Sequence, residues 1–113
     1  MSISRIRAAA LFLLLVGSSA TAYAAAPTVV TTAATSITTS SAVLNGTGTP
    51  NGELTTGWFR YSSTNPVTCN DTFGTRVPAV SGTDLGMGAV AVPYSITTTG
   101  LTSGVTYYFC AIV

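Results

Sequence analysis

Ionisable side chains are scarce in this chain. It has no histidine and no lysine, and only 6% of its 113 residues are charged. Beyond residue 7, the acids Glu53, Asp71 and Asp84 are accompanied by only two cations, Arg60 and Arg76. Acid–base catalysis and nucleophile activation need a base at the reacting atom, and glycoside hydrolysis needs two carboxyl groups close together. Because three scattered acids offer neither, we expect no enzyme activity and assign no catalytic residue.

Metal ligands are scarce as well. Cys69 and Cys110 are the only cysteines, and two cysteines without a histidine cannot fill the tetrahedral shell of a zinc ion. Asn70, Asp71 and Asp84 carry oxygen atoms suited to calcium, but they lack the regular spacing of a calcium-binding loop, and turn formation is their alternative role. We therefore expect no metal site and no cofactor.

The N-terminal residues combine a basic start with an apolar run. Arg5 and Arg7 precede the apolar residues 8–16, and small residues follow up to the AYA sequence at 22–24. This order is typical of a secretory signal peptide. The apolar run is shorter than the roughly 20 residues that span a bilayer. We predict a signal-peptide helix over residues 1–24 and one secreted or cell-surface domain over residues 25–113, without membrane insertion after cleavage.

Cleavage would change the charge balance. The full sequence has a net charge of +1, but the predicted domain keeps two arginines against three acids and so carries −1. Nucleic acids bind to clustered lysine and arginine side chains, and no such cluster remains. We expect no nucleic-acid partner.

The two cysteines are expected to cross-link the domain. A domain of this size buries only about 60% of the surface of its unfolded chain. Secretion would place Cys69 and Cys110 in an oxidising compartment, where a disulfide between them closes a loop of roughly 40 residues and contributes on the order of 4 kcal/mol. We predict this disulfide.

Threonine, valine, serine and glycine are abundant in the domain, whereas residues that favour helices are few. β-Branched side chains pack well on a pleated sheet and lose rotamer freedom in a helix. Short alternating segments are separated by glycine, proline and asparagine, as in the TPNG turn at 49–52. We predict an all-β fold with about six antiparallel strands, at residues 27–33, 41–46, 56–61, 75–80, 94–99 and 105–113.

Four segments of the domain form a pattern: AVLNGT at 42–47, PNG at 50–52, WFRY at 58–61 and GLTSGVTYYF at 100–109. They resemble fibronectin type III-like repeats of bacterial surface and secreted proteins. The most specific is the corner with Leu101, Gly104 and Tyr107, because in such sandwiches a tyrosine that opens a strand bonds back across the corner. The resemblance covers nearly all of residues 25–113 and implies a fibronectin type III or immunoglobulin-like antiparallel β-sandwich.

Two positions depart from the family pattern. The tryptophan that is common on the second strand of the family is replaced by Gly46. The sequence ends at Val113, where the resemblance implies a loop and one more strand, so we expect a C-terminally truncated domain followed by further modules of the same polypeptide. The alternative is a pilin-like subunit whose fold is completed by a strand donated by a neighbour.

Side-chain alternation assigns the faces of the strands. If Tyr107 points into the sandwich, then Phe109 does too, and period two also places Phe59 and Tyr61 in the core. The residues between them point outward. Cys110 should therefore lie on the outer face of its own sheet.

The same outer face should carry Trp58, Arg60 and Tyr108, and two hypotheses follow. In the first, the disulfide pins residues 65–73 over this face, and Trp58 is covered. In the second, the three side chains form an exposed platform that stacks on a sugar or anchors a protein, as aromatic and arginine side chains do in interfaces. We favour the first, because the disulfide supplies the cover.

The resemblance implies a non-catalytic spacer, adhesion or interaction module of a larger secreted or cell-surface protein, with an unknown protein or polysaccharide as partner. A fold alone does not fix function. The alternative is an accessory carbohydrate-binding module of a secreted hydrolase, which would use the Trp58 platform.

Thiol titration tests the disulfide. The native secreted protein should show no reactive thiol, and two should appear after reduction, because both cysteines are predicted to be paired. Two free thiols in the native protein would remove the cross-link.

Overall fold

Seven β-strands make up the computed structural model of the protein, which describes residues 25–113. The predicted signal-peptide helix and its cleavage site lie outside the described residues. No helix occurs within them, so the prediction of an all-β fold is confirmed. The strands are β1 (Thr28–Thr35), β2 (Ala42–Thr49), β3 (Thr55–Ser62), β4 (Thr75–Val77), β5 (Thr83–Gly86), β6 (Val92–Thr98) and β7 (Tyr108–Ile112).

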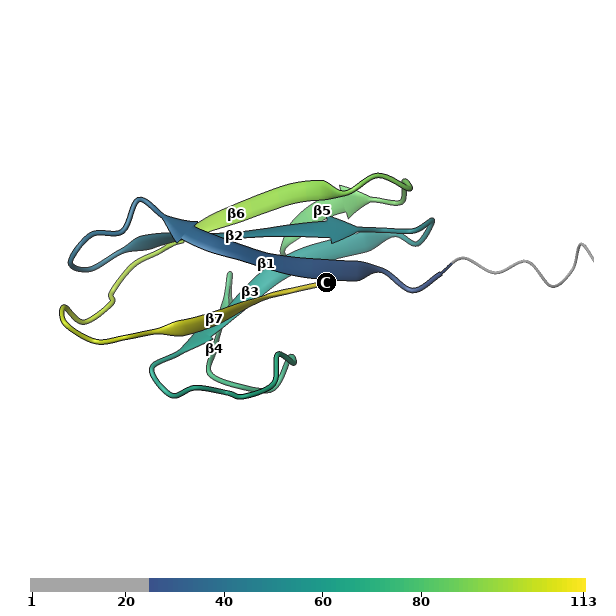
Figure 1. Ribbon diagram of the computed structural model, residues 1–113. Coiled ribbons are helices and arrows are strands. Elements are labelled where there is room, and N and C mark those ends of the chain that lie inside the picture. Colours follow the sequence, from purple (N-terminus) through teal and green to yellow (C-terminus); the bar gives the residue numbers. More distant parts are fainter. Residues whose placement is uncertain (1–24) are drawn as a thin grey trace, which may run out of the picture.

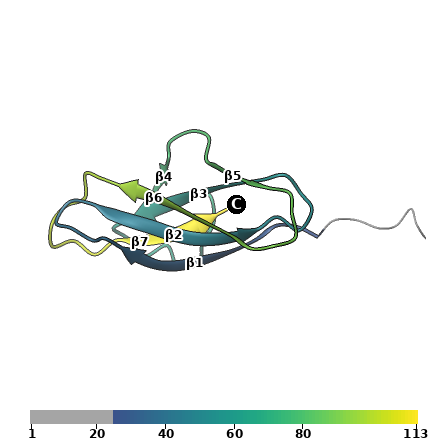
Figure 2. The same ribbon diagram turned by 90° about the horizontal axis from the view of Figure 1, so that it is seen from above.

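The strands form two antiparallel sheets, and Figure 1 shows the sheets as two layers. The first sheet has the order β1-β2-β6. In the second sheet β3 is central: β4 and β5 pair with successive parts of one edge, and β7 pairs with the other edge. The view from above shows the strands of both layers running along the same long direction (Figure 2). This arrangement is consistent with the predicted antiparallel β-sandwich.

β5 is the strand that the sequence pattern does not predict. It lies in the glycine-rich stretch after Pro78 and has four residues, of which Leu85 alone is buried. So short a segment offers too few alternations to be recognised. The last strand is shorter than predicted, because residues 105–107 belong to the corner before β7. The described residues therefore contain seven strands and not six.

The core is built around Phe59, which is only 1% exposed. The Phe59 ring points from β3 into the space between the sheets. Its centroid lies 4.9 Å from that of Tyr94 on β6 and 6.3 Å from that of Phe109 on β7. Leu44 from β2 and Leu85 from β5 complete the contact between the layers. Phe59 and Phe109 thus share one interior, as alternation predicts.

Tyr94 links the two sheets through a polar atom. Its hydroxyl donates a buried hydrogen bond of 2.7 Å to the carbonyl oxygen of Ile112 on β7. Burial raises the pKa of Tyr94 to about 12, so the hydroxyl remains a donor throughout the neutral range. The buried hydroxyl is therefore satisfied and costs the core little.

Gly46 lets the two sheets approach each other closely. A Cβ atom at Gly46 would lie 2.5 Å from Cβ of Ala111 on β7 and 3.2 Å from the carbonyl oxygen of Val30 on β1. Both atoms are fixed by the backbone, so a side chain here would force the strands apart. Gly48 differs, because a Cβ there would first meet the end of the Leu85 side chain, at 2.6 Å.

Replacing Gly46 by alanine should lower the free energy of unfolding by about 1–3 kcal/mol, the usual cost of overpacking a core. Gly48→Ala is the matched control and should cost less, because the Leu85 side chain can move and alanine also restricts the unfolded chain. Urea denaturation with the disulfide intact measures both variants. Equal losses would contradict the close approach at Gly46.

Candidate functional site

β3 presents Trp58 and Arg60 on the face of the second sheet that points away from the core. In the ladder with β7, Trp58 lies opposite Ile112 and Arg60 lies opposite Cys110. Directly opposed residues share a face of a sheet. Cys110 therefore lies on the outer face, where alternation places it. Residues 63–74, which connect β3 to β4, cover part of this face through the contacts described next.

Asp71 joins the connecting loop to β3. Its Oδ1 atom accepts a hydrogen bond of 2.9 Å from Trp58 Nε1 and one of 2.6 Å from Arg60 Nε. Arg60 Nη1 also donates to the carbonyl oxygen of Phe73 over 2.9 Å. The hydrogen bonds from Arg60 and from Trp58 hold the pKa of Asp71 below its ordinary value of 3.8. The carboxylate therefore stays charged at neutral pH and ties the loop to two side chains of one strand.

Arg76 covers the ring of Trp58. Its guanidinium carbon lies 4.5 Å from the ring centroid, which is a cation–π distance. Arg76 is held there by hydrogen bonds to the carbonyl oxygens of Pro78, at 2.6 Å, and of Ser81. One face of the Trp58 ring is thus occupied, and its N–H group is bonded to Asp71.

Tyr108 is the most exposed of the three predicted platform residues, at 39%. It lies opposite Ser62, at the end of the β3–β7 ladder. Trp58 and Arg60 are only partly exposed and are held by the loop. The structure thus brings the three side chains to one face, and Tyr108 is the most exposed of them.

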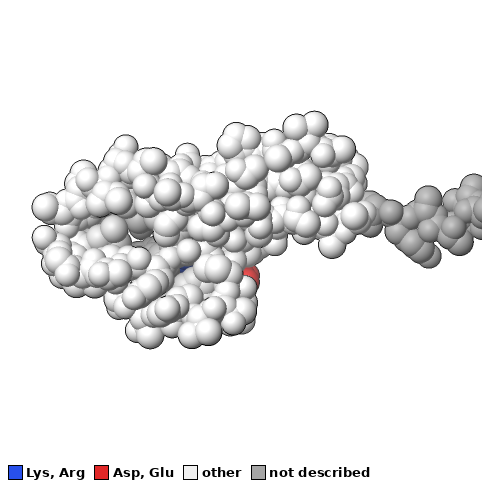
Figure 3. Space-filling view, in the orientation of Figure 1, with Lys and Arg blue, Asp and Glu red and all other residues white. Residues whose placement is uncertain are grey.

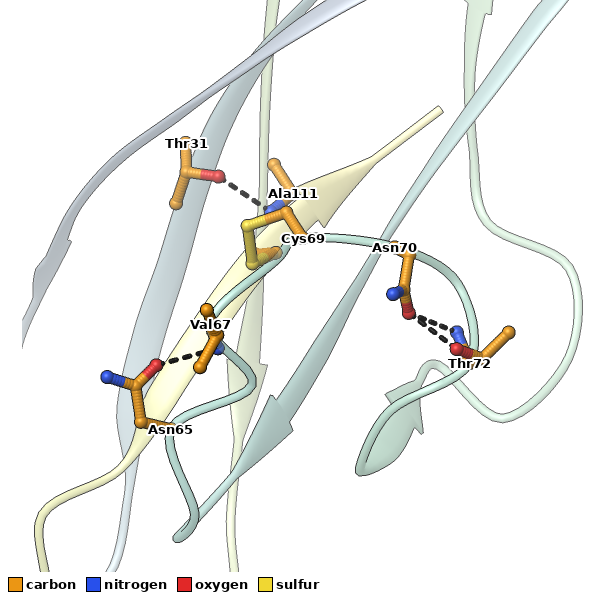
Figure 4. Close-up of a disulfide and its surroundings, with 8 residues drawn as sticks. Thr31, Asn65, Val67, Cys69, Asn70, Thr72 and Ala111 are labelled. Carbon is orange, nitrogen blue, oxygen red and sulfur yellow. Dashed lines mark hydrogen bonds between the residues drawn. A yellow bond between two sulfur atoms is a disulfide. The ribbon is translucent and has the colours of Figure 1, made fainter.

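The disulfide between Cys69 and Cys110 is confirmed, and it fixes the loop to β7 (Figure 4). The Cα atoms of the two cysteines are 5.7 Å apart, and Cys110 is only 3% exposed beneath the loop. Immediately after Cys69 the chain makes an Asx turn, in which Asn70 Oδ1 accepts a hydrogen bond of 2.9 Å from the N–H group of Thr72. The turn shapes the loop locally, and the covalent bond fixes its position.

The corner between β6 and β7 contains Leu101, Gly104 and Tyr107. The Tyr107 hydroxyl accepts a hydrogen bond of 2.9 Å from the backbone N–H of Thr102, which is the bond across the corner that the family motif implies. This hydrogen bond lowers the pKa of Tyr107. Gly104 has a φ of 81°, a value that favours glycine. Leu101 is partly buried, and its N–H donates to Ser40 over 2.9 Å, so the corner is tied to the β1–β2 loop.

The other acids do not gather into a site. Asp84 Oδ1 accepts a hydrogen bond of 2.8 Å from the N–H group of Gly86, within its own turn. Residues 25–113 contain no group of three or more histidine, cysteine, aspartate or glutamate side chains that could hold a metal ion. In the same part of the chain, no helix is long and apolar enough to cross a membrane. The described charged side chains therefore hold loops and turns in place. Glu53 is the exception, because it is exposed and makes no such contact.

The roles of Asp71 and Arg76 were not predicted from the sequence. Alternation identifies Trp58 and Arg60 as outward-facing, but their partners come from a loop and from β4, whose positions depend on tertiary contacts. One signal was present: the NDT sequence at 70–72 forms an Asx turn directly after a cross-linked cysteine. Such a turn constrains where the acid within it can point.

Comparison with known proteins found no family model, no curated protein and no solved structure that matches this chain. Membership of the fibronectin type III-like family therefore stays a prediction that rests on the motif residues.

Replacing Asp71 by asparagine should reduce stability at neutral pH and not at strongly acid pH. The pKa of Asp71 is lower in the folded than in the unfolded protein, so its contribution is present above the ordinary value of 3.8 and is lost as the pH falls through the folded value. The urea midpoints of the wild type and D71N should therefore differ at pH 7 and converge in acid.

Glu53→Gln is the matched control, because Glu53 is exposed and its carboxylate holds no loop. We expect this variant to follow the wild type at every pH. A difference between D71N and the wild type that is the same at all pH values would contradict the assigned ion pair.

Proposed function

We propose that the protein is a non-catalytic extracellular module that acts as a spacer, adhesion or interaction unit, as in the bacterial fibronectin type III-like repeats that it resembles. One observation carries this proposal. Both arginines of the described chain and Asp71 are engaged in holding loops on the outer sheet face. Side chains that are engaged in this way are not free to act as a catalytic acid or base or as metal ligands.

The covalent cross-link supports the extracellular part of the proposal. Structural disulfides persist in oxidising compartments and are rare in the cytosol. The bond between Cys69 and Cys110 spans 41 positions of the sequence and joins a loop to a strand of the same sheet. A spacer or adhesion unit must keep its shape outside the cell, and this cross-link holds the loop on the outer face of its sheet.

A carbohydrate-binding module has less support. Stacking on a sugar requires an open aromatic face. Arg76 lies over the ring of Trp58 at 4.5 Å, and Asp71 holds the ring's N–H group. Tyr108 alone could offer free aromatic surface on this face, and one ring is a weak platform.

A pilin-like subunit is the second candidate, and one observation favours it. Within the described residues β7 pairs with β3 on one side and with no strand on the other. An unpaired strand edge can receive a strand from another chain.

Expression with the signal peptide tests the proposed function. We expect the processed chain in the medium or on the outer surface of intact cells, oxidised at Cys69 and Cys110. We also expect no turnover of chromogenic glycosides, esters or peptides by the purified protein. Reduced protein retained inside the cell would contradict the extracellular role, and saturable hydrolysis of any of these substrates would contradict the non-catalytic one.

A further inference from the structure

Two asparagines of the chain stand in the Asn-x-Thr pattern that oligosaccharyltransferases recognise as an N-glycosylation acceptor. They belong to NGT at 45–47 and to NDT at 70–72. Three residues recur easily by chance, so the pattern alone assigns no modification. The surroundings of the two amide groups differ, and they decide which of the two can accept a glycan.

Asn70 lies between two attachment points of the loop that follows β3. Cys69 is cross-linked to β7, and the Asp71 carboxylate is bonded to two side chains of β3. The side chains on both sides of Asn70 therefore reach toward the sheet, whereas Asn70 itself is exposed. The two attachments hold this asparagine at the surface.

An Asx turn sets the orientation of the Asn70 amide. Its Oδ1 atom accepts a hydrogen bond of 2.9 Å from the N–H group of Thr72 and one of 2.6 Å from the Thr72 hydroxyl. Figure 4 shows the Asn70 oxygen directed at Thr72 and the amide nitrogen on the other side. Nδ2, the atom to which a glycan is attached, thus lies outside the hydrogen bonds of the turn.

The turn also favours the chemistry of glycan transfer. The amide nitrogen loses a proton when it attacks, and the charge of the deprotonated amide is shared with its oxygen. Hydrogen bonds donated to that oxygen stabilise the charged form. Thr72 donates two of them, so the hydroxyl that completes the acceptor pattern already contacts the amide that reacts.

Asn45 offers no such amide. It lies within β2, and its Nδ2 donates hydrogen bonds of 2.9 Å to the carbonyl oxygen of Ala33 and of 3.1 Å to Thr35 Oγ1, both on β1. Extended backbone sets the Cα atoms of Asn45 and Thr47 ~6.8 Å apart, so the two residues form no Asx turn. A glycan on this nitrogen would break the bonds that tie β1 to β2.

The surface of the protein would gain from a hydrophilic group. Only 6% of the residues are charged, and the face seen in Figure 3 shows few charged atoms. Val67, in the same loop as Asn70, is 90% exposed. Surface charge ordinarily keeps proteins soluble, and a glycan supplies hydration by another means.

We propose that Asn70 is an N-glycosylation acceptor of the exported chain and that Asn45 is not. In the transfer, Asn70 Nδ2 forms a bond to the anomeric carbon of a lipid-linked oligosaccharide diphosphate. The bond from this carbon to the diphosphate oxygen breaks, the lipid diphosphate leaves with the electron pair, and the amide proton passes to a base of the transferase. The inference rests on the extracellular part of the proposed function, because such transferases act on exported chains.

Transfer to the purified protein tests the assignment. The exported, oxidised chain is incubated with a single-subunit oligosaccharyltransferase and a lipid-linked oligosaccharide, and intact mass and peptide mapping locate the product. We expect one glycan per chain, at Asn70. Asn45 should be modified at least about tenfold less, because its amide is freed only when the sheet opens.

Unfolded peptides are the matched comparison. One peptide covers residues 40–50 and the other covers residues 65–75 with its cysteine alkylated. Both should accept a glycan, because neither amide is held by a sheet. Equal modification of Asn45 and Asn70 in the folded chain would overturn the proposal. So would the absence of transfer to Asn70 under conditions in which a standard acceptor peptide reacts.

Variants test the role of the turn. Thr72→Ala should lower transfer to Asn70 at least about tenfold, and Thr72→Ser, which keeps the hydroxyl, should stay within several-fold of the wild type. Asn70→Gln should abolish the gain in mass, and Asn45→Gln is the matched control that should leave it unchanged. Peptide mapping of the wild type assigns the site even if a variant does not fold. Undiminished transfer to Thr72→Ala would contradict the proposal.

The two proposals fail separately. Glycan transfer is measured on purified protein, so a failure to modify Asn70 leaves the proposed extracellular role standing. Reduced protein retained inside the cell would contradict that role and not the difference between the two amides, which the transfer assay measures by itself.

Discussion

The ladder between β3 and β7 is the interaction on which the rest of the structure depends. Its register sets Phe59 opposite Ala111 and Arg60 opposite Cys110. One face of both strands therefore enters the core, and the other face carries the disulfide. A slip of one residue would exchange the two faces, because side chains alternate with a period of two. Cys110 would then point into the core, out of reach of the loop that carries Cys69.

The two faces of β3 are buried by different means. The inner face packs against the opposite sheet, where Phe59 meets Tyr94 and buried apolar surface supplies the stabilisation. The outer face is covered in part by the loop 63–74, which a covalent bond at Cys69 and the carboxylate of Asp71 hold in place, and Arg76 lies over Trp58 on the same face. The charges of Arg60, Asp71 and Arg76 thus maintain the shape of this face.

Alternation in the sequence predicts most of the strands and the inward direction of Phe59 and Phe109, because each depends on local pattern. The disulfide is predicted from the cysteine count and the oxidising compartment that a signal peptide implies. Alternation does not predict β5, which is too short to show a pattern, nor the contacts of Asp71, which depend on where a loop settles. The need for glycine at position 46 could not be predicted from the sequence either, because it depends on the nearby Cβ of Ala111 on the other sheet.

The same ladder sets the direction of the backbone groups of β7: every second group faces β3, and the others face the edge where no strand lies among the described residues. Amide hydrogen exchange along β7 tests this register most directly. Slow exchange is predicted at Tyr108, Cys110 and Ile112, and fast exchange is predicted at Phe109, whose N–H group points to the edge. Protection of Phe109 equal to that of Cys110, or rapid exchange at Cys110, would contradict the account.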